Sequence, residues 1–175
     1  MDETTLGQRF STGGEEVLTA AIGHYGQPLL RYCHHVLCDY HEAQDAVQIA
    51  FIKAYETRSR FHSGTNLRAW LYKIAFRTCV DLLRRRRRQL FLPPSDAGWD
   101  PGYIGPELRQ ALESLSPEDR GLLFGRILEE CSYEELSQIY GKSAATLRKR
   151  YERARRKLAG ILTAGQSEAH KEGLS

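Results

Sequence analysis

The sequence lacks the features that would place it in a membrane or make it an enzyme. It has no run of about eighteen apolar residues, so we expect no membrane insertion. It has no Gly-rich phosphate loop, no H-E-x-x-H motif and no carboxylates clustered at metal-ligand spacing, which disfavours an enzyme acting on nucleic acid. Residues 1–14 are acidic and polar, and we expect them to be disordered and to carry no secretory signal.

Cysteine is also scarce. The four cysteines lie in helix-like segments without the spacing of a disulfide scaffold, which favours a reducing cytoplasm. The stretch from Cys33 to His41, CHHVLCDYH, holds thiols and imidazoles but lacks the C-x-x-C spacing common in zinc sites. We interpret it as part of a helix, with metal binding or redox sensing as the less favoured alternative, and we expect no metal and no cofactor.

Proline is scarce outside one segment. Residues 89–106 hold four of the six prolines together with three glycines, a density that neither helix nor strand tolerates. They therefore predict a linker between two small, all-α domains, at residues 15–88 and 107–163, with a polar tail at 164–175. A break or kink is expected near Pro28, in the helix that begins at Glu15.

Charge is distributed unevenly. Residues 89–131 contain eight acidic residues and three arginines, whereas residues 132–162 contain eight cations and three acidic residues. Five consecutive arginines, Arg84 to Arg88, form a second basic patch. Two basic patches on either side of an acidic segment suggest a polyanion that is contacted at two places.

The stretch from Ser132 to Leu162 has the pattern of a helix-turn-helix. Ser132 and Glu135 form an S-x-x-E capping box, Gly141 suits a left-handed helix end, and Ser143 can cap the next helix. Seven of the ten residues from 148 to 157 are cations. We expect this second helix to enter the major groove of DNA, rather than to be only a solvated amphipathic helix. Leu122, Leu123, Ile127 and Leu128 are expected to complete its core.

Residues 39–57 predict a helix with one core face and one docking face. Alanines, Val47, Phe51 and Tyr55 recur at helical spacing on one side. The opposite side mixes Asp45 and Gln48 with Ile49 and Ile52, and two isoleucines on a solvated face favour a protein partner. The alternative is that another helix of the same bundle covers them.

The next helix, from about Leu67 to Arg86, follows the polar loop Phe61 to Asn66. It combines aromatic residues with arginines, a combination that suits single-stranded DNA because bases stack on rings and cations follow phosphates. Trp70 fits a core position at least as well as a stacking position.

Three segments together resemble one family, the extracytoplasmic-function sigma factors of bacterial RNA polymerase. DAVQIAFIKAYE, from Asp45, resembles the polymerase-binding segment of sigma region two. NLRAWLYKIAFRTCVDLLRRRRR, from Asn66, resembles the segments that melt and read the minus-ten element. The sequence from Leu112 to Leu158, LESLSPEDRGLLFGRILEECSYEELSQIYGKSAATLRKRYERARRKL, resembles region four, which reads the minus-thirty-five element. The order, spacing and linker of that family are kept over most of the chain.

The resemblance implies a role for each matching position. The polymerase-binding residues would be Asp45, Gln48, Ile49 and Ile52. The minus-ten DNA would be contacted by Phe61, Asn66, Arg68, Trp70, Lys73, Arg77, Arg84 and Arg85, with a flipped base held by the loop Phe61 to Asn66. The minus-thirty-five DNA would be contacted by Arg126, Ser143, Thr146, Arg148, Lys149, Arg150 and Arg153.

The implied partners are core RNA polymerase, promoter DNA and an anti-sigma protein. The sequence departs from the common family pattern at Ile49, Arg77 and Lys149, where many members have Glu, Asn and Ser. These departures alter the docking face and the base preference at both promoter elements. The alternative is a stand-alone helix-turn-helix repressor with an N-terminal sensing or dimerisation bundle, which would need a symmetric operator.

Overall fold

The computed structural model describes residues 1–89 and 104–172, apart from the side chains of two residues near the end. The described residues form helices and no β-strand, which confirms the all-α prediction. The helices are α1 Glu3–Arg9, α2 Glu15–Leu37, α3 Tyr40–Glu56, the short 3-10 helix η1 Arg58–Arg60, α4 Leu67–Arg88, α5 Pro106–Glu113, α6 Pro117–Ile127, α7 Tyr133–Tyr140 and α8 Ala144–Glu172. The predicted linker lies mostly outside the described residues. We call residues 1–89 the first domain and residues 104–172 the second domain.

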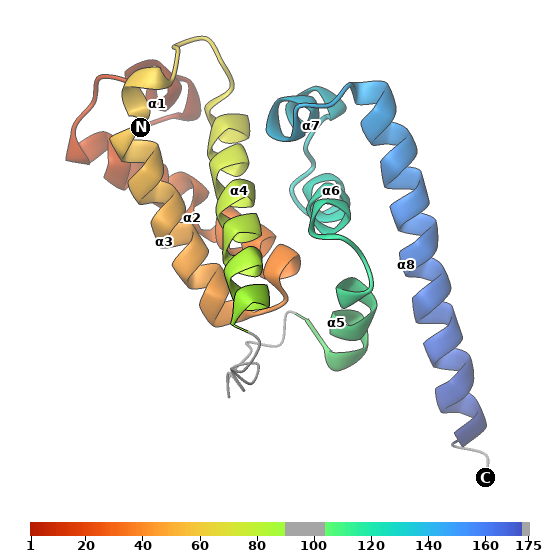
Figure 1. The fold of residues 1–175 in the computed structure, drawn as a ribbon. Coiled ribbons are helices and arrows are strands. Elements are labelled where there is room, and N and C mark those ends of the chain that lie inside the picture. The colour runs from red at the N-terminus through yellow and green to blue at the C-terminus, as the bar shows by residue number, and fades with distance from the viewer. Residues whose placement is uncertain (90–103, 173–175) are drawn as a thin grey trace.

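The first domain is a bundle in which α3 packs against both α2 and α4 (Figure 1). Four alanines of α3 and Phe51 form its buried face: Ala43, Ala46, Ala50, Phe51 and Ala54. Small side chains let the neighbouring helix backbones approach closely, so this stripe sets how the three helices pack. The predicted core face is confirmed at these five positions, whereas Val47 and Tyr55, predicted on the same face, are half-buried.

The expectation that the first fourteen residues are disordered is wrong. Asp2 accepts a hydrogen bond from the backbone of Thr5 and caps α1, and Leu6 and Phe10 are fully buried in the core. These two residues are four positions apart and so lie on one helical face. Their burial stabilises a helix of seven residues that would be marginal in isolation.

The expected break near Pro28 is also absent, because α2 continues through it to Leu37. A proline inside a helix removes one backbone hydrogen bond. Buried side chains on either side of it, Tyr25, Leu29 and Tyr32, anchor both halves of α2 to the core. Tertiary packing therefore outweighs the local preference.

The second domain contains the predicted helix-turn-helix in α7 and α8. Ser132 and Glu135 form both hydrogen bonds of the capping box, and Gly141 ends α7 with a positive φ of 66°. The backbone of Thr146 donates to Ser143 Oγ at 3.2 Å, as expected for a helix cap. The local signals read from the sequence are thus all present.

The core of this domain differs from expectation at the end of α6. Leu122 and Leu123 are buried, but Ile127 and Leu128 are 50% and 38% exposed. The reason is that α6 ends at Ile127, and the chain then turns so that Glu129, not Leu128, faces inward.

The polar tail expected from residue 164 is helical, since α8 continues to Glu172. No proline interrupts this segment, and its residues are exposed wherever the structure describes their side chains. Figure 1 shows α8 extending beyond α5 at its C-terminal end. Within the described residues, no helix combines the length and apolar character that crossing a membrane requires.

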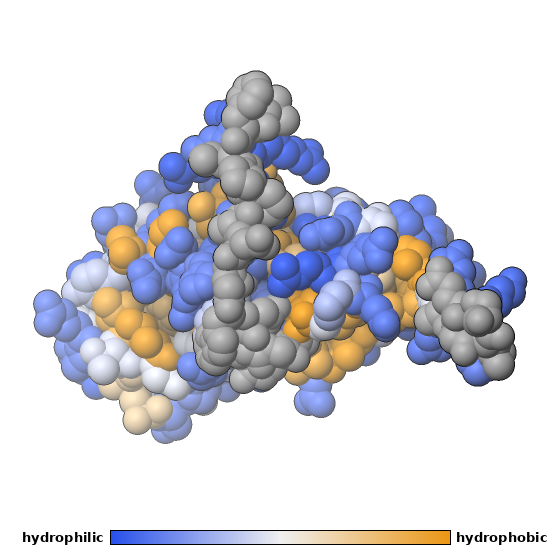
Figure 2. All heavy atoms as spheres, turned by 90° about the horizontal axis from the view of Figure 1, so that it is seen from below, coloured by the Kyte–Doolittle hydropathy of each residue, from blue (hydrophilic) through white to orange (hydrophobic). Residues whose placement is uncertain are grey.

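The two domains pack against each other, α2 against α6 and α4 against α7 (Figure 1). The hydroxyls of Tyr32 and Tyr140 lie 2.6 Å apart, and the rings of His35 and Phe124 have centroids 4.1 Å apart. Figure 2 views the molecule from the end where α4 finishes and shows mostly hydrophilic residues with separate apolar patches. Most of the large apolar side chains are buried inside each domain or between the two domains.

Candidate DNA and polymerase interfaces

The outer face of α3 is exposed, as predicted. Asp45 and Gln48 are exposed, Ile49 is half-buried, and Ile52 is 58% exposed. No helix of the described residues covers Ile52, which removes the alternative that it is an internal contact. A carboxylate, an amide and an apolar side chain on one helix face form a surface suited to a protein partner.

The loop before α4 frames a pocket. Asn66 caps α4 by accepting a hydrogen bond from the backbone of Ala69 at 3.0 Å, and Gly64 takes a positive φ of 102° that glycine allows. The pocket has a volume of about 400 Å³ and is lined by Arg60, Phe61, His62, Thr65, Asn66, Ala69, Trp70, Lys73 and Gln138. An aromatic floor with amide and cationic groups at the rim is suited to a nucleobase.

Three aromatic rings pack against one another at this pocket. Phe61 and Trp70 have ring centroids 5.4 Å apart, and Phe10 of the segment after α1 contacts both, at 5.9 and 5.7 Å. Trp70 therefore belongs to the core and lines the pocket at once. Sequence analysis did not identify Phe10 as a core residue. Its four-residue spacing from Leu6 was the signal that could have done so.

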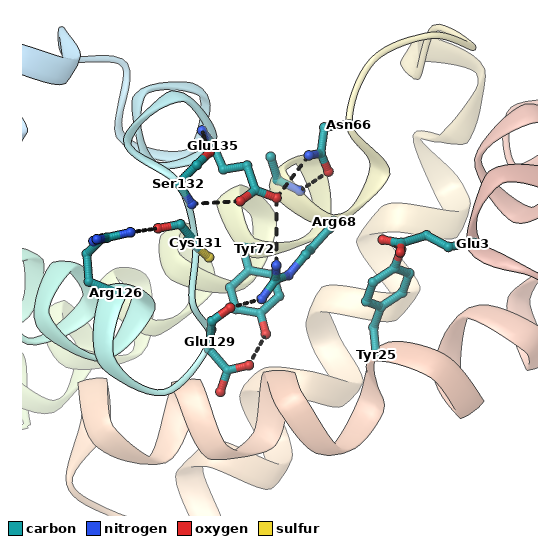
Figure 3. Close-up of polar contacts among 11 residues, drawn as sticks. Glu3, Tyr25, Asn66, Arg68, Tyr72, Arg126, Glu129, Cys131, Ser132 and Glu135 are labelled. Carbon is teal, nitrogen blue, oxygen red and sulfur yellow. Dashed lines mark hydrogen bonds and ion pairs between the residues drawn. The ribbon is translucent and has the colours of Figure 1, made fainter.

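The predicted minus-ten cations of α4 do not lie together. Arg85 lies seventeen positions after Arg68, which places them about 25 Å apart along the helix. Arg77, Arg84 and Arg85 are exposed, Lys73 lines the pocket, and Arg68 points toward the second domain (Figure 3). The arginine run thus forms a separate basic patch at the far end of α4.

The start of α8 presents exposed cations and hydroxyls. Lys149 and Arg153 are exposed, and the guanidinium of Arg148 lies 4.9 Å from the centroid of the Tyr133 ring, where a cation is attracted to the ring face. Ser143 and Thr146 flank them, with their hydroxyl oxygens 2.8 Å apart. Exposed cations in the first turns of the second helix are the arrangement by which helix-turn-helix proteins contact DNA.

Two other predicted DNA contacts are engaged within the protein. Arg150 Nε donates to Asp119 at 2.6 Å and its Nη1 to Glu118 at 2.7 Å, so it ties α8 to the start of α6. Arg126 donates to the carbonyl of Cys131 at 2.8 Å and also lies over the Tyr133 ring. Arg150 thus holds α8 against α6, and Arg126 holds the start of α7 against the end of α6.

A polar cluster around the buried Glu129 joins the two domains, and Figure 3 shows its contacts with Arg68 and Tyr72. Glu129 accepts hydrogen bonds from Arg31 Nε at 2.7 Å and from the Tyr72 hydroxyl at 2.9 Å, and its backbone carbonyl accepts one from Arg68. We call Glu129, Arg31, Arg68 and Tyr72 the Glu129 cluster. Burial, followed by the nearby Glu129 carboxylate, raises the pKa of Tyr72 well above its usual value, so its hydroxyl remains a donor.

A second contact beside this cluster involves Glu135 of α7. Its Oε1 accepts a hydrogen bond from Asn66 Nδ2 at 3.0 Å and lies 3.7 Å from Arg68 Nη1. Its other oxygen accepts from the backbone of Ser132, within the capping box. Sequence reasoning missed Glu129, and it assigned Glu135 only to the cap.

The cysteine and histidine stretch at the end of α2 is buried. Cys33, His34, His35 and Cys38 contribute to the core or to the contact between the domains. Among the described residues, no group of three or more metal-ligating side chains is close enough to hold an ion.

Comparison with known proteins gives the same division of the chain. Residues 21–89 match the family model described as Sigma-70 region 2, and residues 106–158 match that described as Sigma-70, region 4. The ECF RNA polymerase sigma factor SigE of Mycolicibacterium smegmatis is 27% identical over 184 residues, which cover 95% of this chain and 71% of that protein. RNA polymerase sigma factor YlaC of Bacillus subtilis is 29% identical over 157 residues, which cover 82% and 91%.

Two solved structures share the fold. CnrH, in complex with the cytosolic domain of CnrY, has a TM-score of 0.74 and 21% identity, covering 93% of this chain and 97% of that one. The sigma factor RpoE of Bartonella quintana, in complex with the anti-sigma factor NepR, has a TM-score of 0.68 and 24% identity, covering 83% and 96%.

The chain belongs to the extracytoplasmic-function sigma factors of the sigma-70 family. It therefore binds core RNA polymerase and directs transcription initiation at promoters. The alternative of a stand-alone repressor is wrong, because residues 21–89 match sigma region 2 rather than a sensing or dimerisation module.

Proposed function

We propose that three surfaces of this protein each make one of the contacts needed for promoter recognition. The outer face of α3, with Asp45, Gln48, Ile49 and Ile52, binds core polymerase. The pocket beside Asn66 holds an unpaired minus-ten base, and the start of α8 reads the duplex minus-thirty-five element. The observation that carries this proposal is the pairing of a base-sized aromatic pocket with a separate recognition helix in one chain.

Recognition of the minus-thirty-five element would depend on Arg148 and Lys149. Their exposed cationic groups at the start of α8 can donate to guanine edges, and a good bidentate contact contributes about 1 to 3 kcal/mol of discrimination. Arg150 supports this by tying α8 to the start of α6, and Arg126 by its contacts with Cys131 and Tyr133 beside α7. Arg153 and the hydroxyls of Ser143 and Thr146 then contact the DNA backbone.

Capture of the minus-ten strand would use the pocket and the cations of α4. Unstacking a base costs a few kcal/mol, which the interaction with polymerase offsets. Arg77 and the exposed Arg84 and Arg85 follow the phosphate backbone. DNA binding by the free protein is therefore weak and falls steeply with salt.

An anti-sigma protein is the expected regulator. One similar structure contains CnrH with the cytosolic domain of CnrY, and another contains a sigma factor with a partner that is named an anti-sigma factor. We place this protein in the cytoplasm, as a non-enzymatic subunit of the transcription machinery.

Run-off transcription tests the proposed function. Purified core polymerase is incubated with fragmented genomic DNA, with and without this protein. Protein-dependent starts that share a two-part upstream sequence are expected. Ile52→Lys should abolish them by placing a charge on the docking face, while the matched variant Lys53→Arg, on the neighbouring exposed residue, should keep them. Starts that persist with Ile52→Lys would exclude this face of α3.

A further inference from the structure

We propose that in the free protein the second domain occupies the minus-ten surface of the first domain, so that this domain and minus-ten DNA compete for the same side chains. The inference rests on the proposed function, from which it takes the roles of Asn66 and Arg68. It adds an internal binding partner for that surface, namely α7 and the loop between α6 and α7.

The contacts that carry the proposal converge on the start of α4 (Figure 3). Asn66 donates to the Glu135 carboxylate at 3.0 Å, and Arg68 donates to the Glu129 carbonyl while its Nη1 lies 3.7 Å from Glu135. Two residues assigned to DNA thus have their donors directed at the second domain. A DNA strand that used these donors would have to displace Glu129 and Glu135.

The acceptors supplied by the second domain resemble those of DNA. Carboxylate oxygens carry the negative charge and hydrogen-bonding capacity that phosphate oxygens carry, and a backbone carbonyl accepts as a base carbonyl does. The segment from Glu129 to Glu135 contains four glutamates, Glu129, Glu130, Glu134 and Glu135. Two of them face the first domain and two are exposed, so the segment presents a short acidic surface to a basic one.

The pocket is also shared between the domains. Its lining comes from the first domain except for Gln138, which belongs to α7. One side of the proposed base site is therefore made of the competing element. DNA can enter the pocket without a change in the conformation of the loop Phe61 to Asn66 or of the aromatic rings. In contrast, α7 must move away from the pocket.

The interface is built firmly enough to hold the closed arrangement. Glu129 is buried and pairs with Arg31, and Arg120 of α6 donates to the carbonyl of Val36 in α2 at 2.8 Å. Asp45, Ile52 and Lys149 lie outside these contacts and remain exposed. The competition therefore acts on the minus-ten surface and leaves the polymerase face and the recognition helix accessible.

The test compares the affinity of full-length variants for a fluorescein-labelled, 20-nucleotide single-stranded DNA of random sequence, measured by anisotropy without polymerase. The double variant Glu129→Gln, Glu135→Gln removes the two carboxylates that face the first domain. It keeps the capping box, since glutamine serves at that position. The control Glu130→Gln, Glu134→Gln makes the same charge change on the two exposed neighbours.

The facing variant should bind about tenfold more tightly than the control, because apparent affinity rises with the fraction of molecules in the open state. Equal affinities would overturn the proposal. Circular dichroism melting establishes that both variants are folded.

Arg31→Gln provides a second, opposite test. It removes a positive charge, so general electrostatics predicts weaker DNA binding, whereas loss of the Arg31 to Glu129 ion pair predicts tighter binding. Weaker binding would contradict the competition. Failure of the proposed function would appear elsewhere, as absence of polymerase-dependent starts with the wild-type protein in the run-off assay.

Discussion

Arg120 offers the sharpest test of how the two domains are held together. Its guanidinium is buried and donates to three backbone carbonyls, of Val36 at 2.8 Å, Leu112 at 3.0 Å and Leu115 at 2.8 Å. Val36 lies in the last turn of α2 and Leu112 in the last turn of α5. One cation thus satisfies carbonyls at the negative ends of two helices from different domains.

We expect Arg120→Met to lower the free energy of unfolding by about 3 kcal/mol. The carbonyl of Leu112 keeps the backbone N–H of Leu115 as a donor, whereas the carbonyls of Val36 and Leu115 lose the guanidinium. Each buried carbonyl left without a donor costs about 1 to 3 kcal/mol, and removing a buried charge that pairs with no carboxylate in the described part of the chain offsets part of this. Burial already lowers the pKa of Arg120, which shows the cost of holding that charge inside. In a chain of this size, the midpoint of thermal unfolding should fall by about 6 to 12 °C.

The measurement is thermal and urea unfolding followed by circular dichroism. Arg155→Met is the matched control, because that side chain is 58% exposed and, within the described residues, pairs with its helix neighbour Glu152 alone. Its effect should stay within about 0.5 kcal/mol. A loss below about 1 kcal/mol for Arg120→Met would refute the view that this residue clamps the two helix ends.

Three further predictions test other parts of the fold. Gly121→Ala should cost about 1 to 3 kcal/mol of folding free energy, because its Cβ would lie 2.6 Å from the Tyr140 hydroxyl, and a melting temperature equal to wild type would contradict this packing. Gly141→Ala should destabilise the turn of the helix-turn-helix by about 1 kcal/mol, whereas Gly160→Ala, at an open position in α8, should stabilise by up to about 1 kcal/mol; equal signs in urea unfolding would refute the left-handed assignment. Cys131 is buried and burial raises the pKa of its thiol to about 11, so alkylation by iodoacetamide at pH 8, followed by mass spectrometry, should be at least about tenfold slower in the folded protein than in urea; equal rates would contradict the burial of this thiol.

Local signals in the sequence predicted local structure well. The capping box at Ser132, the left-handed Gly141 and the alanine stripe of α3 depend on residues within one turn of each other, and all three are present. The exposure of Ile52 followed from the same helical periodicity. Where short-range geometry decides the outcome, the residue types were sufficient.

Tertiary contacts decided the features that the sequence did not reveal. α1 is ordered because Leu6 and Phe10 reach the core, and the polarity around them concealed this. The exposure of Ile127 depends on where α6 ends and how the following turn is directed. Likewise, Glu129 binds Arg31, which lies 98 positions away in the chain, and no local sequence pattern predicts such a distant pair.

The length of α8 makes its C-terminal end a sensitive position for observing rotation of the second domain. Its 29 residues span about 43 Å, and its C-terminal end extends past α5, away from the first domain (Figure 1). A fluorophore near that end would turn a small rotation of the second domain into a large displacement. A label at the N-terminus would instead sit beside α1, close to the aromatic rings under the base pocket. The far end of α8 is therefore the place for tags, surface attachment and single-molecule probes.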